Sequence, residues 1–145
     1  MKNTIKFAYA VGHSNTFESK HFGDADKYII SEWNEEEIVF MYELTNQFKT
    51  FDEEQEHGSR KKGGAIIKFL KEHGVRVLVS KQFGENIRMV NTHFIPVIVS
   101  TDTIDGVQKI LQKHIGWIED EINNNAEEYK LFTMKNGLLK TIVKK

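Results

Sequence analysis

Apolar and polar residues follow two different periods along the chain, and the first of these periods predicts strands. Short runs rich in β-branched and aromatic residues, bounded by Gly, Asn and Asp, are typical of strands. Such runs predict strands at residues 5–11, 28–33, 37–43, 75–79 and 97–99. A short polar connection joins the second run to the third, so these two strands are expected to form a hairpin.

The later part of the chain adds apolar positions three or four residues apart, which is the spacing of a helical face. Residues 66–73 show this spacing, and Gly74 follows as a C-terminal cap. A short helix is predicted at residues 85–92 and a longer amphipathic helix over residues 107–118. The resulting order is typical of an α/β protein, with a mixed sheet covered by helices. Because proline cannot donate to a ladder, Pro96 places the last of these strands at an edge.

The C-terminal part of the chain differs in charge from the rest. Residues 115–129 carry five acidic side chains and no basic one, whereas residues 130–145 carry five lysines and no acidic side chain. An Asn-Gly pair at 136–137 lies between apolar residues and predicts a second hairpin. We therefore divide the chain into an α/β domain at residues 1–114 and an extension at residues 115–145, an acidic helix followed by a basic hairpin or tail. Pairing of the two charge blocks is the simpler interpretation, and contact of the basic tail with a partner is the alternative.

The composition changes this picture mainly through what is missing. The 145 residues include 20 basic and 21 acidic side chains, and the net charge of −1 argues against nucleic-acid binding through bulk positive charge. The chain has no cysteine, which excludes disulfides, thiolate nucleophiles and cysteine-ligated zinc or iron–sulfur centres. Six histidines are left as the best metal ligands. No apolar run approaches the ~18 residues of a membrane span, and the N-terminal run is better explained as a strand than as a secretory signal, so we expect a cytoplasmic protein.

Three histidines lie in loops that a fold of this kind brings to one end of its sheet. His13 and His21 follow the first strand, and His57 precedes the first helix. Imidazole is the natural ligand for iron, zinc or copper where no thiolate exists. The alternative is that these histidines are simply exposed loop residues, since no metal-binding His pair at helical spacing occurs. The basic, glycine-rich segment 58–64 begins the helix and favours a bulky anion, although it lacks the P-loop pattern.

Little in the chain points to catalysis. No serine lies in a Gly-x-Ser-x-Gly context. The carboxylates gather in polar runs at residues 52–56 and 119–121, and the strands at residues 5–11 and 75–79 carry none. A two-metal nuclease needs carboxylates on its core strands. The residues therefore support neither a catalytic triad nor a two-metal nuclease, and a nuclease is the last of the candidate functions.

Several short segments occur in a characteristic order along the chain. The segments are His21-Phe22-Gly23 followed by Ala25 and residues 28–30, His57-Gly58 before the first helix, the helix–glycine–strand segment 71–79, the turn 80–86, and the last strand and helix from residue 95. Each segment alone is short, but their joint order and spacing extend over residues 5–112. In this combination the chain resembles the dinitrogenase iron–molybdenum cofactor-binding family, of the NifX and NifB C-terminal type.

The resemblance implies an RNase H-like α/β fold, with a five-stranded mixed sheet in the order 3-2-1-4-5 and helices on both faces. It also implies non-catalytic binding and carriage of an iron–sulfur-based or iron–molybdenum-type cofactor, or its precursor, held transiently between donor and acceptor proteins. His21 is the first candidate metal ligand, His57 the second and His13 the third. The resemblance further assigns cofactor-binding positions to Phe22, Gly23, Gly58, Gly84 and Asn86.

An interaction or regulatory domain that keeps the fold without the cofactor is the alternative function. Such a domain is expected to bind partners through an edge strand or through residues 113–145. The absence of cysteine bears directly on how the chain could carry a cofactor. A cluster held without a protein thiolate relies on loop histidines, backbone amides and the basic helix start. Ligation of this kind suits a carrier better than a permanent redox centre.

Overall fold

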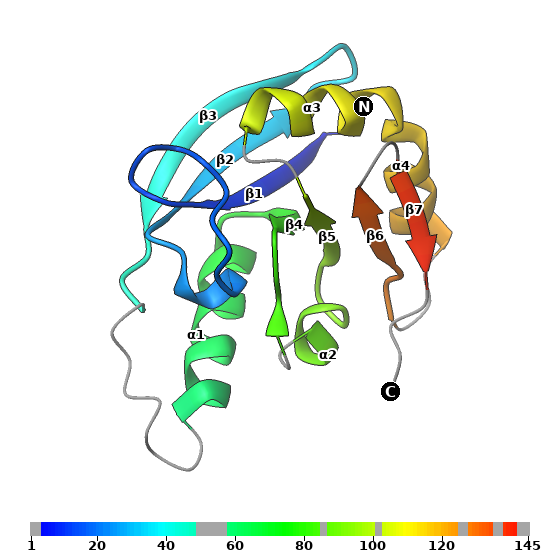
Figure 1. Cartoon of the computed structure of the whole chain (residues 1–145). Coiled ribbons are helices and arrows are strands. Elements are labelled where there is room, and N and C mark those ends of the chain that lie inside the picture. Colours follow the sequence, from blue (N-terminus) through cyan, green and yellow to red (C-terminus); the bar gives the residue numbers. More distant parts are fainter. Residues whose placement is uncertain are drawn as a thin grey trace.

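The computed structural model describes residues 4–48, 58–84, 87–100, 103–124, 128–134 and 138–141, and Figure 1 shows how its helices and strands are arranged. The first elements are β1 (Ile5–Val11), the short 3-10 helix η1 (Phe22–Asp24), β2 (Lys27–Trp33) and β3 (Ile38–Thr45). They are followed by α1 (Gly58–Glu72), β4 (Val75–Ser80), α2 (Ile87–Val90), β5 (Ile95–Val99), α3 (Ile104–Lys113), α4 (Ile115–Asn124), β6 (Leu131–Met134) and β7 (Leu138–Thr141). Within these ranges no helix is long and apolar enough to cross a membrane.

The strands of the described residues form one mixed sheet in the order β3-β2-β1-β4-β5-β6-β7. Pairing is parallel from β1 through β4 and β5 to β6, and antiparallel between β1 and β2, β2 and β3, and β6 and β7. The predicted α/β class and the order 3-2-1-4-5 are therefore present. The predicted number of five strands is wrong, because the C-terminal hairpin extends the same sheet by β6 and β7 (Figure 1).

The predicted edge position of β5 is also wrong. β6 pairs in parallel with β5 over Val97–Val99. On its other side β5 pairs with β4, where Pro96 is opposite Leu78. The proline lies one residue before the ladder that joins β5 to β6, so its missing N–H removes no bond from that ladder. A proline next to the start of a strand is compatible with an interior position.

The long helix expected over residues 107–118 is divided into α3 and α4. His114 lies between them, with a φ of −112° and a ψ of 24°, outside helical geometry. The first of the two helices is capped by Thr103, whose side chain accepts a hydrogen bond from the Gly106 N–H at 3.3 Å. Both helices bury apolar residues in the same layer, including Leu111 from α3 and Ile118 from α4. After the break, α4 contacts β5.

Side chains of β1 alternate between two buried layers, as expected for a central strand. Phe7 and Tyr9 belong to the layer that α3 and α4 cover. Ala8 and Ala10 belong to the opposite layer, which α1 and α2 cover. Helices therefore cover both faces of the sheet, as predicted, and β1 places its following loop between the two layers.

The C-terminal hairpin is held to the rest of the sheet by buried side chains and by backbone hydrogen bonds. Phe132 is 0% exposed and lies in the layer under α3 and α4. The Tyr129 N–H donates to the Asn91 carbonyl at 2.8 Å, and the Asn91 side chain donates back to the Tyr129 carbonyl at 3.1 Å. Glu121, buried on α4, accepts the Lys130 N–H at 2.9 Å. The helix and hairpin expected after residue 114 thus form part of the same buried core.

Ile118→Val is expected to lower the free energy of unfolding by about 0.5–1.5 kcal/mol. The cause is the loss of a buried methylene, because Ile118 on α4 is 0% exposed. Urea unfolding followed by circular dichroism measures the change. Ile115→Val makes the same change at a half-buried position and is expected to cost less. Equal losses for the two variants would contradict the docking of α4 through Ile118.

Candidate functional site

The candidate site is built from the loops that follow β1, β4 and β5. These strands run parallel, so their carboxyl ends lie at one edge of the sheet. The loop after β1 reaches the other two through isolated bridges, from Thr16 to Thr103 and from His21 to Gln82. Carboxyl ends of strands are where α/β sheets bind their ligands. The bridges hold these loops together at that edge.

His21 and Gly84, which come from different loops, lie in direct contact. His21 precedes η1 in an extended conformation, and its side chain is exposed. Gly84 has a φ of +67°, in the left-handed region that favours glycine. A Cβ at position 84 would lie 2.8 Å from both Nδ1 and Cε1 of His21. The glycine is therefore what allows the imidazole to rest against this turn.

Gly84→Ala is expected to displace the His21 ring and to strain the turn. A non-glycine residue in the left-handed region costs about 1–2 kcal/mol, and the added Cβ overlaps the imidazole at 2.8 Å. Chemical shifts of the His21 ring, measured by NMR, report the displacement. Gly64→Ala is the matched control, because nothing lies within 4 Å of a Cβ there. An unchanged His21 ring in Gly84→Ala would contradict the contact.

Hydrogen bonds fix the backbone on both sides of this contact. The Phe22 N–H donates to the Gln82 carbonyl at 2.8 Å, and the Ser80 hydroxyl donates to the same carbonyl at 2.9 Å. The Tyr28 hydroxyl donates to the Phe22 carbonyl at 2.9 Å. Burial raises the pKa of Tyr28 and the Asp24 carboxylate raises it further, so the hydroxyl stays protonated at neutral pH. The turn that carries His21 is therefore anchored to β2 and to the loop after β4.

Phe22 supplies the apolar anchor beneath His21. Its side chain is 4% exposed. The ring stacks on Tyr28 with centroids 4.8 Å apart, and on Phe83 with centroids 5.5 Å apart and planes at 15°. Stacked aromatic pairs add to the free energy of burial. Because Phe83 precedes Gly84 directly, this stack also positions the glycine on which His21 rests.

The N-terminal part of α1 lies next to the His21-Phe22-Gly23 turn. Gly63 and Ile66 of α1 line a small apolar cavity together with Phe22 and Gly23. Its volume of about 20 Å³ is close to that of one water molecule and cannot hold a cofactor. A bulky ligand at this edge must lie on the surface of the loops rather than beneath them.

The sequence did not reveal two buried polar residues that brace this loop. Asn46, directly after β3, is 5% exposed, and its side-chain amide donates to the carbonyls of Gly23 and Ala25 at 2.9 and 2.8 Å. Asp26 is 8% exposed and accepts the His13 N–H at 3.2 Å. An Asn or Asp beside a strand is a common turn former. The presence of Asn or Asp beside a strand predicts a turn, but it does not predict that these side chains hold the loop after β1 in place.

The predicted site residues are only partly brought together. Phe22 and Gly23 lie beside His21, and Gly84 contacts it. Nε2 of His13 lies 3.6 Å from Asp26, with which it forms an ion pair when protonated. Gly58 is the first residue of α1, whereas His57 and Asn86 lie outside the described residues. Among the residues that are described, no group of three or more His, Asp or Glu side chains is arranged to hold a metal ion.

These observations define an α/β domain with a surface site made of loops at the carboxyl edge of its parallel strands. In sequence comparison, residues 3–116 match the family described as dinitrogenase iron-molybdenum cofactor. The chain belongs to this family. The match ends in the first turn of α4, so most of α4 and the β6–β7 hairpin lie beyond it. No functionally curated protein matches the chain.

Proposed function

We propose that this protein binds and carries an iron–sulfur-based metallocofactor or its precursor, as a non-catalytic carrier in the cytoplasm. Membership of a family associated with the dinitrogenase iron-molybdenum cofactor supports the class of ligand. One observation carries the assignment of the site, namely the exposed His21 imidazole resting on Gly84 at the carboxyl edge of the sheet. The strand order 3-2-1-4-5 within the sheet supports an RNase H-like domain, to which residues 115–145 add a helix and a hairpin.

The donor set fits a cofactor that is attached at few points. His21 supplies one imidazole, and the chain has no cysteine. The start of α1, like that of any helix, points backbone N–H groups outward, where they attract anions, and its sequence includes Arg60, Lys61 and Lys62. Gly63 in the N-terminal half of α1 lines the same small cavity as Gly23, which follows His21 by two residues. The N-terminal half of α1 is therefore next to the turn that carries His21. An anionic cluster can therefore bind to one metal ligand, the His21 imidazole, and interact with the positive end of the α1 dipole.

His57 is proposed as the second ligand, because it directly precedes Gly58, where α1 begins. Asn86, two residues after Gly84, is proposed to shape the neighbouring loop. Donor and acceptor proteins are the proposed partners. Weak ligation at a surface allows an acceptor with thiolate ligands to remove the cluster, since thiolates are the stronger ligands for iron–sulfur clusters.

Anaerobic uptake and transfer of a cluster test this function. The full chain is incubated with a preformed [4Fe–4S] cluster held by small thiols, separated by gel filtration, and measured for iron, sulfide and visible absorbance. About one cluster per chain is expected, and an apo-ferredoxin is expected to remove it within minutes. Absence of protein-bound iron would overturn the binding function. Iron that is bound but not given up to the acceptor would overturn the carrier function.

A further inference from the structure

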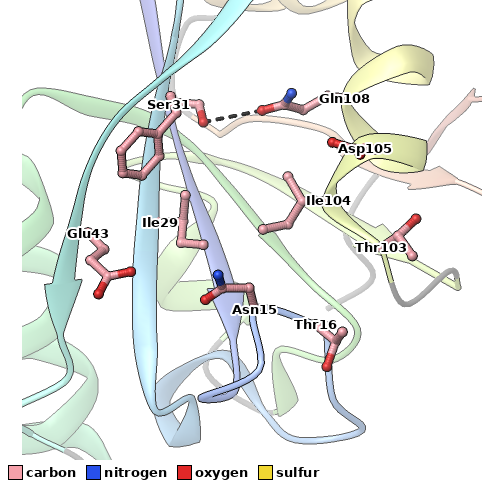
Figure 2. A pocket seen from close by; sticks show the side chains of 10 residues that line it. Asn15, Thr16, Ile29, Ser31, Glu43, Thr103, Ile104, Asp105 and Gln108 are labelled. Carbon is pink, nitrogen blue, oxygen red and sulfur yellow. Dashed lines mark hydrogen bonds between the residues drawn. The ribbon is translucent and has the colours of Figure 1, made fainter.

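A second hollow lies on the opposite side of the loop after β1, under the start of α3. Figure 2 shows it between β2, β3, the loop that carries Asn15, and the first turn of α3. Its volume is about 520 Å³, which is in the range of small-molecule sites. The cofactor assigned to the His21 edge does not account for this groove.

The charged groups that line the groove are carboxylates on opposite walls. Glu43 lies on the β3 wall and Asp105 on the α3 wall (Figure 2). Glu43 Oε2 is 3.2 Å from Lys27 Nζ, and the Glu43 side chain remains 53% exposed. Asp105 is exposed and forms no ion pair within the described residues. Of the residues that line the groove, none is Lys, Arg or His.

Apolar surface separates these two carboxylates. Ile29 lines the groove from β2, Ile104 lines it from α3, and Phe40 lines it from β3. The Phe40 side chain is 63% exposed, so its ring is accessible to a ligand in the groove. An exposed aromatic ring beside carboxylates attracts organic cations through its π-face. Anions such as an iron–sulfur cofactor are repelled by the same carboxylates.

The remaining polar groups include acceptors that can orient a cation. The Ser31 hydroxyl donates to Gln108 Oε1 at 3.3 Å, and an amide oxygen has a second lone pair that can accept an ammonium N–H. Asn15 adds a further side-chain amide from the loop. Polar groups of this kind orient a ligand, whereas the carboxylates determine its charge.

We propose that this groove binds a small aliphatic dication, in which two ammonium or guanidinium groups are joined by a methylene chain. One cationic end pairs with Asp105 and the other with Glu43. The methylene chain then covers the apolar surface of Ile104 and Phe40, which otherwise faces water, beside the buried Ile29. A ligand with one charge brings a cation to only one of the two carboxylates, and a neutral diol brings a cation to neither.

Isothermal titration of the full chain with α,ω-diaminoalkanes of increasing length tests the proposal. The monoamine and the diol of the same length serve as matched probes. We expect one preferred diamine to bind about tenfold tighter than its monoamine, and no binding of the diol. Asp105→Asn is expected to reduce diamine affinity about three- to tenfold, and Phe40→Ala to reduce it about threefold. Asp120→Asn removes an exposed carboxylate on α4 and is expected to change nothing.

Several results would overturn this site. They are equal affinity for diamine and monoamine, binding of the diol, and full affinity in Asp105→Asn. Amide shifts in NMR that fall outside the groove would also overturn it, because binding would then be spread over the acidic surface. His21→Ala is expected to leave diamine binding unchanged, so this test is separate from that of cofactor carriage.

Discussion

His21→Ala is expected to reduce cluster uptake by more than about tenfold while leaving the fold unchanged. His21 supplies the imidazole assigned to the cluster, and the chain contains no thiolate to replace it. Loss of residues that only orient metal ligands costs about 10–100-fold in affinity, so loss of the ligand itself is expected to cost at least as much. Iron retained per chain after anaerobic gel filtration measures the effect. Because His21 is exposed, the free energy of unfolding is expected to change by less than about 0.5 kcal/mol.

His13→Ala is the matched control for this variant. His13 is also an exposed histidine of the loop after β1, but its ring lies 3.6 Å from Asp26 rather than on the Gly84 turn. Uptake is expected to stay within about twofold of the unmodified chain, which is less than 0.5 kcal/mol. If both variants lose uptake equally, general loss of imidazole matters rather than the position of His21.

Phe22→Ala is expected to lower the free energy of unfolding by about 3–5 kcal/mol. The ring is 4% exposed and stacks on both Tyr28 and Phe83, so its removal leaves a cavity between β2 and the loop after β4. Denaturant unfolding measures the loss. In the temperature range where this variant is still folded, cluster uptake is also expected to fall, because the His21 turn loses its anchor.

Phe40→Ala removes the same side chain from an exposed position and serves as the control. Phe40 is 63% exposed on β3, so its removal is expected to change the free energy of unfolding by no more than about 0.5 kcal/mol. A similar cost for the two variants would contradict the packing of Phe22. Together with His21→Ala, these variants distinguish the proposed role of His21, which is to bind the cluster, from that of Phe22, which is to position His21.

The sequence predicted the elements better than their assembly. β1 was predicted with its observed bounds, and the other predicted strands were found with small shifts, because each is a short apolar run between polar turns. The hairpin at 131–141 was predicted from its Asn-Gly pair. Its addition beside β5 is not predicted by the sequence, because Pro96 indicates an edge strand at that point. A proline excludes a ladder bond only at its own position, and the β6 ladder begins at Val97.

Long-range contacts account for most of what could not be predicted. His114 continues the apolar spacing of a helix, so this spacing does not mark the break between α3 and α4. The bonds from Asn46 to Gly23 and Ala25 join residues about twenty positions apart, which a pattern of single residues does not encode. For the candidate site, His21 and Gly84 were predicted from the family resemblance, and their contact came only from the structure.

Coordination of the cluster by His21 can be measured most directly by pulsed EPR of the reduced, cluster-loaded protein. The chain is produced with ¹⁵N-labelled histidine, and the coupling of imidazole nitrogen to the cluster spin is recorded for the unmodified chain, His21→Ala and His13→Ala. Our account predicts a coordinated imidazole in the unmodified chain and in His13→Ala, and loss or clear weakening of that coupling in His21→Ala. A loaded protein without imidazole coupling, or the same coupling in His21→Ala, would contradict it.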